Sequence, residues 1–177
     1  MKMRDGFVSN SSSSSFIIPF DKKPESIHEM KEILFGDKEY YYDPYYDPDS
    51  TYFSERTAKY PAMQVAETVF KDIEYQKPLS EEQLVEELSR GYISSTLQDG
   101  TTEPSMEDFR DSDNDINWEA YDNAFREYTK KLAKEIIAEA ENKELYVVNY
   151  SDDDCYGCAL EHGPLFDKIG SFRISKH

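Results

Sequence analysis

Positively charged residues are scarce in this chain of 177 residues. Its 20 Lys and Arg stand against 37 Asp and Glu, which gives a formal net charge of −17 at pH 7. A surface with this excess of carboxylates repels phosphate backbones and anionic lipid headgroups. We therefore expect no direct binding of nucleic acid through a basic patch and no binding to a membrane surface.

Long apolar runs are also missing. No segment approaches the ~18 uninterrupted apolar residues of a membrane-spanning helix, and the N-terminus has no apolar core of the kind found in signal peptides. The sequence predicts a soluble protein of the cytoplasm.

Cysteine is limited to Cys155 and Cys158, in a C-x-x-C spacing. A four-cysteine zinc site needs a second pair, and a thioredoxin-like site opens a helix after a strand, where the helix N-terminus lowers the thiol pKa. Here Gly157 lies inside the pair in a turn-like stretch. We interpret the two cysteines as free thiols in a hairpin, with metal and redox roles as the alternatives.

Aromatic residues, in contrast, are plentiful. They make up 14% of the chain, with 14 Tyr and 10 Phe, whereas acidic disordered chains are poor in large apolar groups. The chain is therefore expected to fold, and its length suits one domain. We expect a single α+β domain over 1–177, with a Tyr-rich loop at 38–60 and an acidic segment at 99–117 as internal insertions.

Helices are the clearest local signals, because apolar residues recur every three or four positions. The predicted helices cover 24–36, 61–73, 80–91 and 117–142. Pro24 is expected in the first turn of the first helix, and Gly36 ends it. Ser80 and Gln83 form a predicted capping box at the start of the third.

Strand signals lie at the two ends of the chain. We expect strands at 16–19, 144–150, 158–161 and 171–175, with a turn before the third of these and a short helical or turn connection before the last. Short isolated strands are unstable and must find partners. The sequence therefore predicts a small, mostly antiparallel sheet of about four strands built from both chain ends and packed with three or four helices from the middle.

Carboxylates and imidazoles are concentrated near the C-terminus, in a turn, at the end of the predicted 158–161 strand and at the last position. A carboxylate beside an imidazole orients the ring and raises its basicity, which suits an acid/base pair or a divalent metal. The candidate catalytic residues are Asp152, Asp154, Glu161, His162 and His177. The alternative is that the Asp run caps a tight turn and His162 is a surface residue. No spacing identifies a metal, so the cofactor stays open.

A run of five serines precedes the first predicted strand. Consecutive small polar residues can direct N–H groups and hydroxyls at an anion, although no Gly-rich phosphate loop is present. The candidate anion or substrate contacts are Asn10, Ser11, Ser12, Ser13, Ser14 and Ser15. The other interpretations are a flexible linker and a structural loop whose hydroxyls satisfy buried backbone groups.

Two segments suggest a partner surface. The stretch 40–53 contains YYDP twice and is either a loop folded back on the core or an exposed aromatic surface. The segment 99–127 holds ten carboxylates against two arginines; its calcium-loop likeness fails because Ile116 replaces the required Gly. We expect a partner-facing surface instead. Its candidate residues are Tyr42, Tyr45, Tyr46, Asp111, Asp113 and Asp115.

The sequences at the two ends of the chain resemble those of a known group of proteins. "MKMRDGFVSNSSSSSFII" is similar to the N-terminal signature R-x-GFVSNSSSSSF of a scattered set of uncharacterised bacteriophage and bacterial proteins, and "YSDDD", "LEHG" and "RISKH" resemble their tail. Cys155 stands where that group has Gly. The resemblance covers about the first 18 and last 35 residues. It implies a phage-type origin and pairing of the two ends, and it supplies no mechanism.

Two classes of function follow. The first is a small acidic phage-type accessory protein that binds a host protein in the host cytoplasm and interferes with host enzyme or defence machinery. The second is a metal-assisted hydrolase or transferase whose site combines the serine run with the C-terminal Asp, Glu and His residues.

Overall fold

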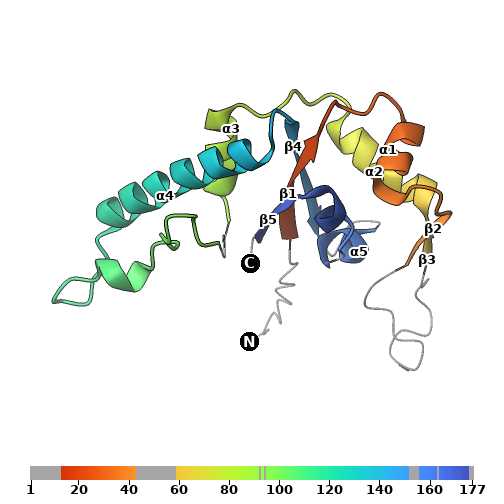
Figure 1. The fold of residues 1–177 in the computed structure, drawn as a ribbon. Helices are drawn as coiled ribbons and strands as arrows, with labels where there is room; N and C mark the ends of the chain where they lie inside the picture. The colour runs from red at the N-terminus through yellow and green to blue at the C-terminus, as the bar shows by residue number, and fades with distance from the viewer. Residues whose placement is uncertain are drawn as a thin grey trace, which may run out of the picture.

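An antiparallel sheet of three strands lies at the centre of the molecule. The computed structural model describes residues 13–42, 59–91, 93, 95–151, 156–162 and 164–175. Strand β1 (Ser13–Phe20) is the middle strand, between β4 (Glu144–Ser151) and β5 (Phe172–Ser175) (Figure 1). The predicted pairing of the two chain ends in one sheet is confirmed, because Phe16 lies opposite both Val148 and Arg173.

Helices cover both faces of this sheet (Figure 1). Successive strand residues point to opposite faces, and β1 is buried on both of them. Phe16 and Ile18 belong to one apolar cluster, whereas Ile17 belongs to the other. This is why β1 contains a continuous apolar run, Phe16 to Ile18, and not an alternating pattern.

The first cluster packs the sheet against α1 (Ile27–Phe35), α2 (Ala62–Ile73), α5 (Gly157–His162) and the 3-10 helix η2 (Phe166–Ile169). Beside α2, β2 (Tyr40–Tyr42) and β3 (Lys59–Pro61) form a separate two-stranded sheet. The second cluster packs the opposite face against α3 (Glu81–Leu88) and α4 (Trp118–Glu139). The 3-10 helix η1 (Met106–Phe109) lies beside α4.

Side-chain caps fix where the helices begin. Ser80 Oγ accepts a hydrogen bond from Gln83 N, and Gln83 Oε1 accepts one from Ser80 N, so the predicted capping box is confirmed. The first helix starts later than predicted, at Ile27. Ser26 is its cap and accepts a hydrogen bond from Glu29 N, which leaves Pro24 buried ahead of the helix.

The predicted strand at 158–161 is wrong, because these residues lie in α5. Leu160 N donates to Tyr156 O at 2.8 Å, a helical bond over four residues. Ala159 and Leu160 are both buried, which breaks the alternation expected of a half-buried strand. Among the described residues the sheet therefore has three strands, and residues 158–161 do not form the returning strand of the hairpin expected around Cys155 and Cys158.

Across the residues that the structure describes, no helix is long and apolar enough to span a bilayer.

Candidate functional site

Three strand termini meet at one end of the sheet. Strand β1 begins at Ser13, β4 ends at Ser151 and β5 ends at Ser175; Ser13 lies opposite Ser151, and Ser14 lies opposite Ser175. Six predicted site residues fall within three chain positions of these termini but lie outside the described residues. They are Asn10, Ser11, Ser12, Asp152, Asp154 and His177.

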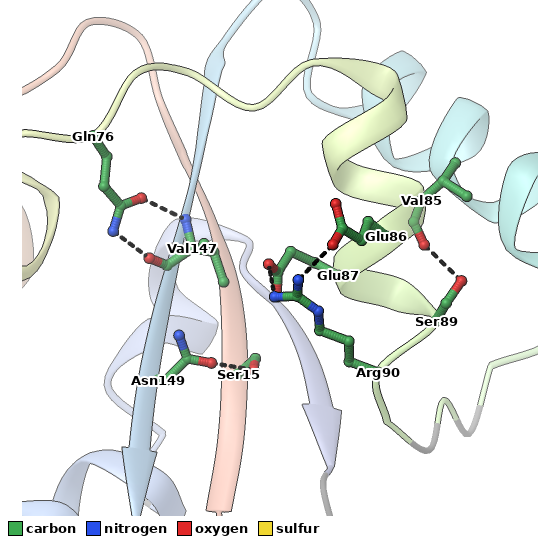
Figure 2. A network of polar contacts seen from close by, with 9 residues as sticks. All are labelled: Ser15, Gln76, Val85, Glu86, Glu87, Ser89, Arg90, Val147 and Asn149. Atoms are coloured by element: carbon green, nitrogen blue, oxygen red, sulfur yellow. Dashed lines mark hydrogen bonds and ion pairs between the residues drawn. The ribbon is translucent and has the colours of Figure 1, made fainter.

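The last three serines of the run belong to the sheet and not to a loop. Ser14 Oγ accepts hydrogen bonds from Arg173 Nε at 3.1 Å and Nη2 at 3.0 Å. Ser15 Oγ donates to Asn149 Oδ1 at 2.5 Å (Figure 2). Both serines are buried, so these cross-strand bonds satisfy hydroxyls that would otherwise be costly to bury. The expectation of a serine loop is therefore wrong for Ser13, Ser14 and Ser15, which lie in a strand. The hydroxyls of Ser14 and Ser15 bond to side chains, whereas the loop interpretation had them satisfy backbone groups.

Glu161 and His162 lie in α5 and not at the end of a strand. The helix packs on β4 and β1, and its Leu160 joins the same apolar cluster as Phe16. Arg173 stacks over the Phe16 ring at 5.8 Å, which places its guanidinium on this side of the sheet too. Glu161 is completely buried. Within the described part of the chain, no three His, Cys, Asp or Glu residues are grouped so that they could hold a metal ion.

The described start of the Tyr-rich segment packs against the core. Tyr41 OH donates to Ala159 O at 3.3 Å, and its ring lies 5.7 Å from that of Phe35. Tyr42 is the last residue of β2, whereas Tyr45 and Tyr46 lie outside the described residues.

The acidic loop before α4 is held by its own aspartates. Asp111 Oδ1 accepts hydrogen bonds from Asp113 N at 2.9 Å and Asp115 N at 3.1 Å, and Asp115 O accepts one from Asp111 N at 2.9 Å. The carboxylate of Asp111 thus forms the turn, while all three residues are exposed. The loop adds negative charge beside the start of α4.

A ladder of aromatic rings runs along the N-terminal half of α4; we call it the aromatic arm, formed by Phe109, Trp118, Tyr121 and Phe125. The Tyr121 ring lies 5.7 Å from Phe109, 6.2 Å from Trp118 and 5.9 Å from Phe125. Trp118 is 55% exposed, and no residue from 98 to 127 is buried. This half of α4 extends away from the sheet, with the η1 segment alongside (Figure 1).

The sequence predicted a helix over 117–142 but not which part of its apolar stripe is buried; Trp118, Tyr121 and Phe125 continue the stripe that Tyr128 and Leu132 bury farther along α4. One signal could have shown which part. At 1.5 Å per residue, the 22-residue α4 is about 33 Å long and the eight-residue α3 about 12 Å, so α3 is too short to cover it.

Next to the arm, residues of α3 and α4 line a groove at the surface. It consists of two adjoining hollows of ≈ 570 and ≈ 720 Å³, which share Glu82, Val85 and Arg126. Phe125 and Val85 supply its apolar lining. Its charged lining residues are Glu81, Glu82, Glu86, Asp122, Arg126 and Lys130. Glu86 is ion-paired with Arg90 at 2.6 Å, and Ser89 Oγ donates to Val85 O at 2.7 Å (Figure 2).

One partly buried and two exposed polar contacts lie at the base of the arm. Tyr128 OH donates to Ser95 O at 2.7 Å, and burial raises the pKa of this phenol, with Glu103 and Glu135 raising it further. Asp99 accepts from Thr101 N at 2.8 Å and pairs with Lys131 at 3.1 Å. Hydrogen bonds from Thr101 and then from Lys131 lower the pKa of Asp99 to about 2.

Comparisons of the chain with protein-family models, with curated proteins and with solved structures gave no match, so its function is inferred from the residues described above.

Proposed function

We propose that this protein is a small acidic accessory protein that binds a basic protein through the aromatic arm. If the family resemblance of the chain ends reflects a phage origin, the partner is a host protein, and binding interferes with a host enzyme or defence system. The observation that carries the proposal is the exposed half of α4, where the apolar stripe continues but the burial stops.

The arm consists of one exposed ring and three partly buried rings, and such a row of aromatic rings at the surface favours an interface. Tyr, Trp and Phe are enriched in the cores of protein interfaces, and Trp and Tyr dominate their binding energy. In the arm these residues stand in a row, with Trp118 more than half exposed. A partner that covers them removes apolar surface from water, which stabilises the complex.

Charge selects the partner. The segment 99–127 carries ten carboxylates and two arginines, in a chain of net charge −17. A second copy of this chain would bring like charges together across the arm, whereas a basic surface is attracted to it. Association should slow as salt shortens the Debye length from ~10 Å at 0.1 M to ~3 Å at 1 M.

The test is affinity capture from host lysate with three forms of the full chain: the native protein, Trp118→Ser on the arm, and Tyr75→Ser as the matched control. Tyr75 is 88% exposed and lies next to α2, on the other side of the sheet. We expect the native chain and the Tyr75→Ser variant to capture a basic protein that the Trp118→Ser variant does not capture. Salt should elute this protein. Equal retention by all three forms would show that the arm is not the binding site.

A second candidate function, a metal-assisted hydrolase or transferase, is favoured by the convergence of three strand termini at one end of the sheet. Asp152, Asp154 and His177 would act there with Glu161 and His162 of α5. Its test is metal analysis and turnover assays on the native chain, on Glu161→Gln and on a form without Lys176 and His177. Loss of a stoichiometric metal or of turnover in the shortened form, with little change in melting temperature, would support it; a metal-free, inactive native protein would oppose it.

A further inference from the structure

We infer that the partner places a basic amphipathic helix in the groove between α3 and α4. This inference rests on the proposed function. It adds which secondary-structure element of the partner binds and where on this protein that element lies. The groove joins the aromatic arm through Phe125, which belongs to both.

The shape of the groove suits a third helix. Trp118, Tyr121 and Phe125 are spaced at i, i+3 and i+7, the spacing by which a helix forms a ridge that packs into the groove of a neighbour. Farther along α4, Leu132 and Ile136 continue this stripe and pack in the same apolar cluster as Leu84 and Leu88 of α3. Toward the N-terminus of α4, no helix of the described residues covers the stripe. A hollow lined by Val85 and Phe125 lies there instead.

Backbone hydrogen bonding decides between a helix and an extended segment. An extended peptide gains affinity by pairing its N–H and C=O groups with an exposed strand edge. The walls of this groove are helices, whose backbone groups in the helix interior are already bonded within the helix. A helical ligand satisfies its own backbone and needs only side-chain contacts, so it fits these walls.

The charges around the groove favour cations on the flanks of that helix. Glu81, Glu82, Glu86 and Asp122 line the hollows, against the two cations Arg126 and Lys130. Arg90 pairs with Glu86, and Lys130 pairs with Glu127 at 2.7 Å. Lys or Arg side chains of the partner would meet the lining carboxylates while its apolar face contacts Val85 and Phe125. Arg126, which lines both hollows, suits the carbonyl-rich C-terminal end of the bound helix.

The same charges argue against occupants from this chain. A second copy would bring a net charge of −17 to an acidic groove. The Tyr-rich segment 43–58 carries Asp43, Asp47, Asp49 and Glu55 against a single Arg56, so it is acidic as well. A basic partner helix is the occupant that the charges select.

Trp118 is the only tryptophan in the chain, so its fluorescence reports on this region directly. The probes are two synthetic peptides of equal length and composition, made of Leu, Ala and Lys and about 15 residues long for four helical turns. One places Leu at helical i, i+3, i+4 and i+7 spacing; the other has the same residues scrambled so that no apolar face forms. Each is titrated into the full chain at low and high salt.

We expect the amphipathic peptide to bind at least about tenfold more tightly than the scrambled one, a difference of ~1.4 kcal/mol. The double variant Glu82→Lys, Asp122→Lys should weaken its binding about tenfold or more. Glu32→Lys, Glu29→Lys is the matched control, because these two residues are also exposed but lie on α1, across the sheet. Circular dichroism of each variant checks that the helices are retained.

Equal, salt-sensitive binding of both peptides would overturn the helix inference and leave the proposed binding of a basic partner in place. The helix inference would also be overturned, and the proposed binding of a basic partner left in place, if the Glu32→Lys, Glu29→Lys variant weakened peptide binding as much as the Glu82→Lys, Asp122→Lys variant. Failure of both peptides to bind, at any salt, would overturn both the inference and the proposed function.

Discussion

The side-chain amide of Gln76 pairs with both backbone groups of Val147. Its Nε2 donates to Val147 O at 2.8 Å, and its Oε1 accepts from Val147 N at 3.4 Å (Figure 2). Val147 lies in β4, an outer strand of the sheet, and Leu79 N donates to Leu145 O at 2.8 Å two residues earlier. Unpaired groups on an outer strand are a template for pairing with another chain. The connection from α2 to α3 therefore protects this edge.

Gln76→Ala should lower the free energy of unfolding by about 1–2 kcal/mol, because it removes two hydrogen bonds from partly buried backbone groups. Urea unfolding followed by circular dichroism measures the change. Gln98→Ala is the control: Gln98 is exposed and its side chain should contribute less than about 0.5 kcal/mol. Equal effects of the two substitutions would show that the Gln76 amide does not stabilise the edge.

Ser80→Ala should cost about 1 kcal/mol, because it removes the acceptor for the N–H of Gln83 at the start of α3. Gln83→Ala removes the reciprocal bond to Ser80 N and should cost less, since that N–H is exposed to water. The two single variants and the double variant, compared by urea unfolding, give the coupling between the bonds. A Ser80→Ala variant as stable as the native chain would contradict the cap.

Asp99 makes stability depend on pH. Its folded-state pKa is lowered from 3.8 to about 2, so the stabilisation is present above 3.8 and is lost as the pH falls toward about 2. The native chain should therefore lose stability relative to Asp99→Asn over this range. Thermal melts of both proteins from pH 5 downward measure the difference. Asp108→Asn, which removes an exposed carboxylate from η1, controls for the change in net charge; an identical pH profile for both variants would contradict the role of Asp99.

Phe166→Ala should cost about 3–5 kcal/mol, the usual cost of deleting a buried phenylalanine ring. Phe166 is fully buried, and its ring lies 4.8 Å from Phe16 and 6.0 Å from Tyr150, so its removal leaves a cavity between η2 and the sheet face formed by β1 and β4. Ile137→Ala on the exposed side of α4 is the control and should change the melting temperature little. A small effect at Phe166 would mean that the core collapses into the space.

Local sequence signals predicted the parts of the fold that depend on neighbours along the chain. The capping box at Ser80 and the apolar spacing of α2 and α4 are of this kind. Pairing of the two chain ends was predicted for another reason, since the remaining strand signals had no other partners. The α5 segment was missed because four residues hold too little periodicity to separate a strand from a helix.

The candidate site was harder to predict, because its features depend on distant residues. Ser15 bonds to a residue 134 positions away and Ser14 to one 159 positions away, and no local pattern contains those partners. The spacing of apolar residues along α4 is the same in its buried half and its exposed half. Which half is buried depends on how far α3 extends along it. Asp111, Asp113 and Asp115 were predicted as partner-surface residues from charge alone, and that prediction needs no tertiary information.

The central position of β1 in the sheet affects when the sheet can form during synthesis on the ribosome. Both of its neighbours, β4 and β5, follow α4 in the chain, so β1 emerges first and waits until most of the polypeptide has been synthesised. During that time Phe16, Ile17 and Ile18 form an apolar triplet without a sheet, of the kind that chaperones bind and that aggregates nucleate from. The five hydroxyls of Ser11 to Ser15 stand directly before this triplet. Hydroxyls can bond to water as long as no protein partner is present, and in the folded chain Ser14 and Ser15 are bonded to Arg173 and Asn149.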